Sequence, residues 1–236
     1  MNAESDPKVM AIDDALAPIL ARLEQHRLRM ENMSPQERQD FEQKKKEREI
    51  EQRNGRIAHL RSIWNVPPRH AQCSPQKEGV WGKSLKMLSE LLSSEDGVTI
   101  GLVGGRGSGK TQLAVELMKE RTRELHSAYF TTATEFFIAV KSTYDRESQA
   151  NEETVLRRFA SYSLLVVDEI GKRGGSDWEN NLLFEMLNRR YNGLKDTILI
   201  DNRTKSEFIA TIGPSLASRM SEGGGIIECN WPSFRH

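Results

Sequence analysis

The spacing of apolar residues divides the chain into a helical first part and a second part in which strands and helices alternate. Up to about Ile63 the apolar residues recur at helical spacing, and strand signals are scarce. After Gly97, short and almost wholly apolar runs alternate with helical stretches. This alternation predicts an α/β fold whose parallel sheet is covered by helices on both faces.

The first part is predicted to contain two helices. Over residues 9–30, Pro18 either kinks the helix or the helix starts just before it. Ser34 and Glu37 form a predicted capping box, with Pro35 in the first turn of the second helix. Residues 38–61 are dense in charged side chains, so this helix is either an exposed surface element or a partner-binding arm. The apolar positions of the first helix are Ile12, Leu16, Leu20 and Leu23.

Two consecutive prolines, Pro67 and Pro68, mark the predicted domain boundary, because they force an extended or turn conformation. We expect a helical, charged N-terminal segment over residues 1–63 and a linker with a lead-in helix over residues 64–96. An α/β domain follows over residues 97–236. The lead-in helix is expected at residues 84–92, with Leu85, Met87, Leu88, Leu91 and Leu92 on or near one face.

The alternating part predicts five strands and the helices that connect them. The strands are expected at residues 98–103, 127–131, 162–168, 197–201 and 225–229. The helices are expected at residues 110–124, 133–145, 178–191, 206–212 and 214–221.

Composition limits the possible classes of partner. Hydrophobic residues make up 37% and charged residues 29% of the 236 residues, which fits one domain with a core plus a polar segment that buries little. The formal net charge is zero, so any contact with nucleic acid has to come from a local patch.

Cysteine usage and apolar runs predict a cytoplasmic protein. Cys73 and Cys229 form no Cys-x-x-Cys or Cys/His cluster, which argues against a zinc site. The N-terminus lacks the layout of a signal peptide, so a disulfide between the two is not expected. The longest apolar runs are too short to span a bilayer.

The run from Gly104 to Thr111 matches the phosphate-binding pattern G-x-x-x-x-G-K-[ST] in full. It follows a predicted strand and opens a predicted helix, a context that disfavours the alternative of a chance Gly-rich turn. Glycines let successive N–H groups point inward around phosphate oxygens. Lys110 is expected to reach the β- and γ-phosphates of ATP, and the Thr111 hydroxyl to bind Mg²⁺. The loop residues expected to hold ATP are Gly104, Gly105, Arg106, Gly107, Ser108, Gly109, Lys110 and Thr111.

Two acids, Asp168 and Glu169, follow the apolar run of residues 164–167. They are expected at the carboxyl edge of the sheet, where open α/β folds bind their ligands. Asp168 would hold Mg²⁺, and Glu169 would polarise the attacking water. A strand end with two solvated acids is the alternative.

Two further polar residues are candidates for catalysis. Asn202 closes the strand beside the acids, where it could orient the water or touch the γ-phosphate, although a turn-forming Asn is the alternative. Arg219 has the fixed guanidinium that suits transition-state charge on a phosphoryl group, and an ordinary surface arginine is the alternative.

In this order, these residues resemble the AAA+ ATPases. Further segments resemble the DnaC-type replicative helicase loaders and, more distantly, the IstB transposition ATPases. The segments that carry this resemblance are Pro67–Ser74, Val166–Gly171, Asn188–Tyr191, Leu216–Met220 and Asn230–Arg235. The resemblance implies an ATPase with slow turnover that partners stimulate, and ATP and Mg²⁺ as its cofactors.

The resemblance also implies roles for single residues. Asn202 takes the position of sensor 1, Arg219 that of an arginine finger acting on a neighbouring subunit, and Arg235 that of sensor 2. A solvated C-terminal arginine is the other reading of Arg235. Asp201 departs from the family, which more often has Thr or Ser before the Asn. The sequence ends just after the last strand, so the helical lid of larger AAA+ proteins is expected to be missing.

The leading hypothesis is a helicase loader that self-associates through AAA+ interfaces. It would bind a replicative DNA helicase through its N-terminal segment and deliver it to single-stranded DNA, in a bacterial or phage-infected cell and without a membrane partner. The alternatives are an IstB-like ATPase that assists a transposase and an ATP-dependent recruitment switch with little turnover. The long helical segment favours the loader, and the zero net charge counts against extensive DNA wrapping.

Overall fold

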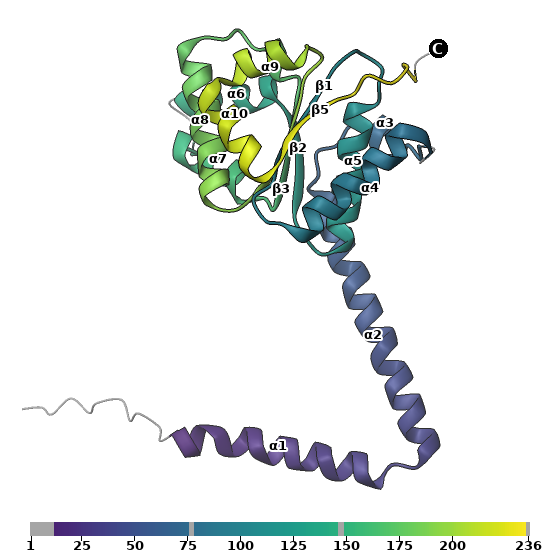
Figure 1. Ribbon diagram of the computed structural model, residues 1–236. Coiled ribbons are helices and arrows are strands. Elements are labelled where there is room, and N and C mark those ends of the chain that lie inside the picture. The colour runs from purple at the N-terminus through teal and green to yellow at the C-terminus, as the bar shows by residue number, and fades with distance from the viewer. Residues whose placement is uncertain (1–11, 76–77, 146–148, 235–236) are drawn as a thin grey trace, which may run out of the picture. The chain divides into compact units, whose positions relative to one another are not determined.

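The computed structural model describes residues 12–75, 78–145 and 149–234 (Figure 1). Contacts within the chain divide it into two units, residues 1–55 and residues 56–236. The assignment of separate roles to residues 1–63, 64–96 and 97–236 stays a prediction. No helix within the described stretches has the length and apolarity needed to cross a membrane.

The first unit is helical and ends within a long polar helix. α1 spans Ile12–Asn32, so Pro18 lies inside the helix. α2 spans Pro35–Ser62 and begins at the predicted capping box, which the structure confirms. The Glu37 N–H donates to Ser34 Oγ (3.3 Å), and the Glu37 carboxylate accepts from the Ser34 N–H (2.8 Å). No residue of α2 is buried, which confirms the solvated helix expected there.

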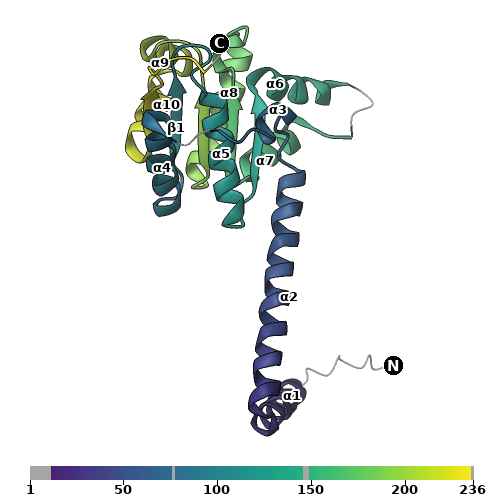
Figure 2. The same ribbon diagram turned by 90° about the vertical axis from the view of Figure 1, so that its right-hand side faces the viewer.

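Within the described residues of the second unit, five parallel strands form one sheet in the order β2-β3-β4-β1-β5 (Figures 1 and 2). Each predicted strand is confirmed to within two residues at either end. β1 lies between β4 and β5, because Ile100 pairs with Ile198 on one side and Gly225 on the other. The strands are β1 (Thr99–Val103), β2 (Ala128–Thr132), β3 (Leu164–Asp168), β4 (Asp196–Ile200) and β5 (Gly225–Glu228).

Helices cover both faces of this sheet, as the sequence predicts (Figure 1). α4 and α5 lie on one face, and α6 to α10 on the other. The sheet is buried on both sides because neighbouring residues of β3 enter different cores: Val166 packs with α4 and α5, and Val167 with the opposite helices. The helices are α3 (Pro68–Ala71), α4 (Gly79–Ser94), α5 (Lys110–Arg123), α6 (Ala133–Lys141), α7 (Glu152–Ser161), α8 (Asp177–Asn192), α9 (Lys205–Ile212) and α10 (Pro214–Gly223), with 3₁₀ turns η1 (Ser142–Tyr144) and η2 (Ile170–Lys172).

The structure departs from the predicted elements at several places. The lead-in helix expected at residues 84–92 is longer and spans Gly79–Ser94, and the short helix α3 begins at Pro68, where the sequence predicts an extended or turn conformation. α7 was not predicted, although Asn151 caps it by accepting from the Thr154 N–H (2.8 Å). The helix expected to run to Asp145 ends as an α-helix at Lys141 and continues as a 3₁₀ turn. Met87 was expected on or near the apolar face of α4 but is 55% exposed, so that part of the prediction is wrong.

Buried arginines fix the amino ends of the strands. Arg190 is fully buried and donates to the carbonyl oxygens of Phe159 (2.8 Å) and Tyr162 (2.9 Å) and to Thr197 Oγ1 (2.9 Å). Burial lowers the pKa of Arg190 to about 9. Arg121 pairs with the Asp196 carboxylate at 3.0 Å. These hydrogen bonds and this ion pair hold the amino ends of β3 and β4 in place. They lie at the end of the sheet opposite to the carboxyl edge, where the predicted site residues are expected.

Candidate nucleotide site

Residues 104–109 connect β1 to α5 as the predicted phosphate loop. Gly104, Gly107 and Gly109 have φ angles of 121°, 85° and 78°, which L side chains rarely adopt. A side chain at Gly104 would also lack room, because a Cβ there would lie 3.2 Å from the Cys229 carbonyl oxygen. α5 begins at Lys110, so the amino end of this helix, where a helix dipole favours an anion, lies directly at the end of the loop.

Lys110 is turned back onto this loop. Its side chain is buried, with the residue 4% exposed. Nζ donates to the carbonyl oxygens of Gly104 (2.9 Å) and Gly105 (2.7 Å) and to Ser108 Oγ (3.3 Å). The loop therefore holds a positive charge at the place where the sequence predicts the phosphates.

Asp168 and Thr111 meet at the carboxyl end of β3. Thr111 Oγ1 donates to Asp168 Oδ2 at 2.8 Å, and the Glu169 N–H donates to Asp168 Oδ1 at 2.6 Å. Burial raises the pKa of Asp168, while these two hydrogen bonds act in the opposite direction. A hydroxyl and a carboxylate thus lie together, which is the kind of oxygen pair that Mg²⁺ accepts.

Glu169 and Asn202 lie at the ends of neighbouring strands. β3 and β4 pair in parallel, so their carboxyl ends meet at one edge. Glu169 has φ of 59°, in the left-handed region, and its carboxylate forms an ion pair with Lys172. Asn202 is exposed, and both residues line the same cavity as Lys110. The sequence did not predict Lys172 as a partner of Glu169.

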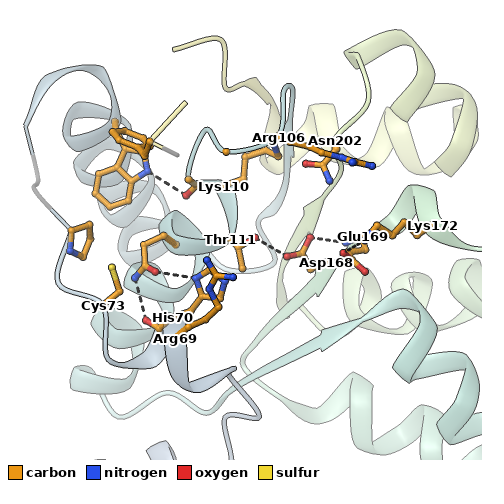
Figure 3. A pocket seen from close by; sticks show the side chains of 16 residues that line it. Arg69, His70, Cys73, Arg106, Lys110, Thr111, Asp168, Glu169, Lys172 and Asn202 are labelled. Carbon is orange, nitrogen blue, oxygen red and sulfur yellow. Dashed lines mark hydrogen bonds and ion pairs between the residues drawn. The ribbon is translucent and has the colours of Figure 1, made fainter. Parts of the chain in front are cut away.

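The cavity has a volume of about 630 Å³, enough for a nucleotide. Figure 3 shows Asp168, Glu169 and Asn202 on one side of it and His70 and Cys73 on the other. It lies wholly within the second unit. The predicted residues that line it are Arg106, Gly107, Gly109, Lys110, Thr111, Asp168, Glu169 and Asn202.

The other half of the cavity was missed by the sequence analysis. It comes from the lead-in segment, from α4 and from the last described residues, namely Arg69, His70, Cys73, Pro75, Trp81 and Phe234. α5 anchors the lead-in segment, because Gln112 donates to the His70 carbonyl oxygen (3.2 Å) and Lys119 to that of Cys73 (3.0 Å). The resemblance marks residues 67–74 and 230–235, and among these it implies a role toward the nucleotide for Arg235 alone.

Arg219 does not line this cavity. It lies on α10, and its guanidinium donates to Asn188 Oδ1. The guanidinium carbon lies 5.5 Å from the ring centroid of Phe184 and 5.1 Å from that of Tyr191. These neighbours on α8 hold the arginine apart from the site of its own chain. Arg235 lies outside the described residues.

Comparison with known proteins identifies relatives of this arrangement. The family model for IstB-like ATP binding proteins matches residues 43–221. The replicative helicase loader DnaC of Escherichia coli K12 is 26% identical over 195 residues, which cover 78% of this chain and 79% of that protein. A crystal structure of the DnaC helicase loader superposes with a TM-score of 0.58 at 22% identity, covering 69% of this chain and 99% of that one. AMPPCP-bound DnaA of Aquifex aeolicus superposes with a TM-score of 0.54 at 20% identity, covering 70% of this chain and 51% of the DnaA chain.

Proposed function

The chain belongs to the family of IstB-like ATP binding proteins, and from this premise we propose that it is an ATP-dependent loader of a replicative DNA helicase. It is an AAA+-type ATPase, as its family and its fold indicate. The observation that carries the loader proposal is the similarity to DnaC loaders over 78% of this chain. The proposed task is delivery of the helicase to single-stranded DNA at the start of replication, in the cytoplasm.

ATP is proposed to bind with its phosphates in the loop of residues 104–111. The Lys110 ammonium already contacts loop carbonyl oxygens, and phosphate oxygens would offer it stronger, charge-assisted hydrogen bonds. Trp81 and Phe234 line the cavity with aromatic rings, which suit the flat base of the nucleotide. Both rings approach Gly109, so the base is assigned to the part of the cavity that adjoins the end of the loop.

Hydrolysis requires activation of a water molecule, and Glu169 is proposed to act as the general base. The carboxylate lines the cavity, and its Lys172 partner would have to release it or share it. Asn202, which lies just beyond the carboxyl end of the neighbouring strand β4, is proposed to orient the same water. Mg²⁺ is proposed to bind at Thr111 and Asp168, where it would neutralise phosphate charge. The hydroxyl and carboxylate there fit this cation.

Arg219 is proposed to act on a neighbouring subunit. Because it does not line its own cavity, it can contribute to phosphoryl transfer only where a second copy places its site beside α10. Self-association through such head-to-tail contacts would then control the rate.

The helicase is proposed to bind the N-terminal segment. α1 exposes apolar side chains at helical spacing, and such a stripe fits an apolar groove on a partner. Leu20 and Leu23 are each 61% exposed, so changing them costs little folding energy. The exposed apolar residues of α1 are Leu16, Ile19, Leu20, Leu23 and Leu28.

Single-stranded DNA is proposed to bind through a local aromatic and basic cluster. Tyr144 is 57% exposed and accepts a hydrogen bond from Trp178 Nε1 (3.1 Å). The Lys141 ammonium lies 5.1 Å from the Trp178 ring centroid. Proteins that bind single strands combine such rings, which stack on bases, with cations that contact phosphates. This cluster is proposed as the local patch that a chain of zero net charge needs, although it also contains an acid, because the Tyr144 hydroxyl donates to the Glu152 carboxylate.

The test is capture by the purified replicative helicase of the source organism. Wild-type protein should be retained, and the double variant Leu20→Glu, Leu23→Glu should be lost while it still binds ATP. Gln25→Glu is the matched control, because it adds a negative charge to another side of α1 and should be retained. If wild-type protein binds a transposase and not the helicase, the IstB-like alternative, which the family match favours, replaces the loader.

A further inference from the structure

Three consecutive carbonyl groups of the phosphate loop accept hydrogen bonds from aromatic residues outside it. The Phe234 N–H donates to the Gly107 carbonyl oxygen at 2.9 Å. Trp231 Nε1 donates to that of Ser108 at 2.6 Å, and Trp81 Nε1 to that of Gly109 at 3.3 Å. Two of the three donors belong to the segment of residues 230–234, called here the C-terminal strap.

The strap is anchored beside the loop. It follows β5, where the Cys229 N–H donates to the Val103 carbonyl oxygen at 2.8 Å, one residue before the loop begins. Trp231 is partly buried and packs against the core on the α4 and α5 side of the sheet. A Cβ placed on Gly109 would lie 3.2 Å from the Phe234 ring, which shows how closely the strap approaches the loop.

The direction of these hydrogen bonds matters for phosphate binding. The N–H and C=O of a peptide unit point in opposite directions, so a loop that aims N–H groups at phosphate oxygens must aim carbonyl groups outward. An outward carbonyl without a donor is costly when it is removed from water. Trp81, Trp231 and Phe234 supply donors to these outward carbonyl groups. Their hydrogen bonds therefore stabilise the loop conformation in which the N–H groups face the nucleotide.

We propose that the C-terminal strap positions the phosphate loop, and that Trp231 is its principal positioning residue. Trp231 is not among the residues that line the cavity, so it acts through the Ser108 carbonyl group rather than on the nucleotide. Because such coupling is reciprocal, ATP should also hold the strap in place. The proposal rests on the proposed binding of ATP by this loop.

The first measurement is the affinity for a non-hydrolysable ATP analogue, by isothermal titration calorimetry on the full chain. Trp231→Phe keeps an aromatic ring and removes the indole N–H, so affinity should fall by about 3- to 10-fold. Trp64→Phe is the matched control, because Trp64 Nε1 donates to Thr122 Oγ1 (3.0 Å) in the core and away from the loop. Its affinity should stay within about twofold of wild type, and thermal unfolding without nucleotide should show both variants folded.

The second measurement needs no variant. Hydrogen exchange of the Phe234 amide, which donates to Gly107, should slow when the wild-type protein binds the analogue. Wild-type protein that binds no nucleotide would overturn the proposed function itself. If wild-type protein binds the analogue, equal affinity in Trp231→Phe or unchanged exchange at Phe234 would overturn the role of the strap.

Discussion

Replacing Arg219 with Ala should leave ATP binding intact and remove hydrolysis by an assembly of subunits. The arginine lies outside its own cavity, so the nucleotide contacts of the same chain should not change. Arginine fingers supplied by a neighbouring molecule contribute about 10³–10⁵ in rate. The variant should therefore hydrolyse ATP at least about a thousandfold more slowly.

The same change should cost the fold little. It removes two cation–π contacts, to Phe184 and Tyr191, and one hydrogen bond to Asn188. Such interactions together contribute about 1–3 kcal/mol, against a typical stability of about 5–15 kcal/mol, so the variant should remain folded. Arg189→Ala is the matched control, because it removes a nearby arginine that pairs with Glu153 and Glu185, and it should keep the wild-type rate.

The assay is phosphate release from ATP at rising protein concentration. Wild-type activity should rise more than linearly, because the proposed arginine finger comes from a second subunit. In an equal mixture of Arg219→Ala and Lys110→Ala, an active interface needs the pocket of the first variant and the arginine of the second. Random mixing produces this pairing at about a quarter of the interfaces, so about a quarter of the wild-type rate should return. No rescue, with wild-type activity proportional to protein concentration, would refute a role for Arg219 between subunits.

Lys110→Ala should abolish ATP binding in a fluorescent-nucleotide titration, because the loop loses the buried ammonium that is proposed to contact the phosphates; wild-type affinity would exclude this loop as the site. Glu169→Gln should keep ATP binding and slow hydrolysis by about 10²–10⁴, since an amide is not a base, and a rate near wild type would assign water activation to another residue. Arg121→Leu should lower the free energy of unfolding, measured by chemical denaturation, by about 3–5 kcal/mol, because the buried Asp196 carboxylate loses its cationic partner and keeps only the Val98 N–H. Arg157→Ala removes an exposed ion pair and should lower the free energy of unfolding by less than about 1 kcal/mol. Equal losses of stability in the two variants would contradict the larger contribution assigned to the buried pair.

The parts of the site that the sequence predicts are those encoded in short continuous runs. The loop from Gly104 to Thr111 and the pair Asp168 and Glu169 each follow an apolar strand, so their place at the carboxyl edge follows from the parallel sheet. β1, β3 and β4 were also recognisable, because their burial on both faces requires near-continuous apolar runs. β5 has no buried residue and was recognisable from its two adjacent isoleucines, Ile226 and Ile227.

The parts that the sequence did not predict depend on residues far apart in the chain. Trp81 and Phe234 line the same cavity although they lie far apart in the sequence, one before the five strands and the other after them. No local pattern marks either residue as a ligand contact. The aromatic neighbours of Arg219 lie on α8, and their contact depends on how α8 and α10 pack. α7 is a different case, because Asn151 followed by Val155, Leu156 and Phe159 was a readable helix start.

The central position of β1 has a consequence for biosynthesis. Its two partners, β4 and β5, lie roughly a hundred residues or more further along the chain, so the edges of β1 stay open while the intervening segments are made. A nascent chain that already contains the phosphate loop therefore has neither the neighbouring strand that precedes Asn202 nor the one that precedes Trp231. Nucleotide binding should appear late and abruptly during synthesis, and chains halted before β5 should expose an apolar strand edge that invites aggregation.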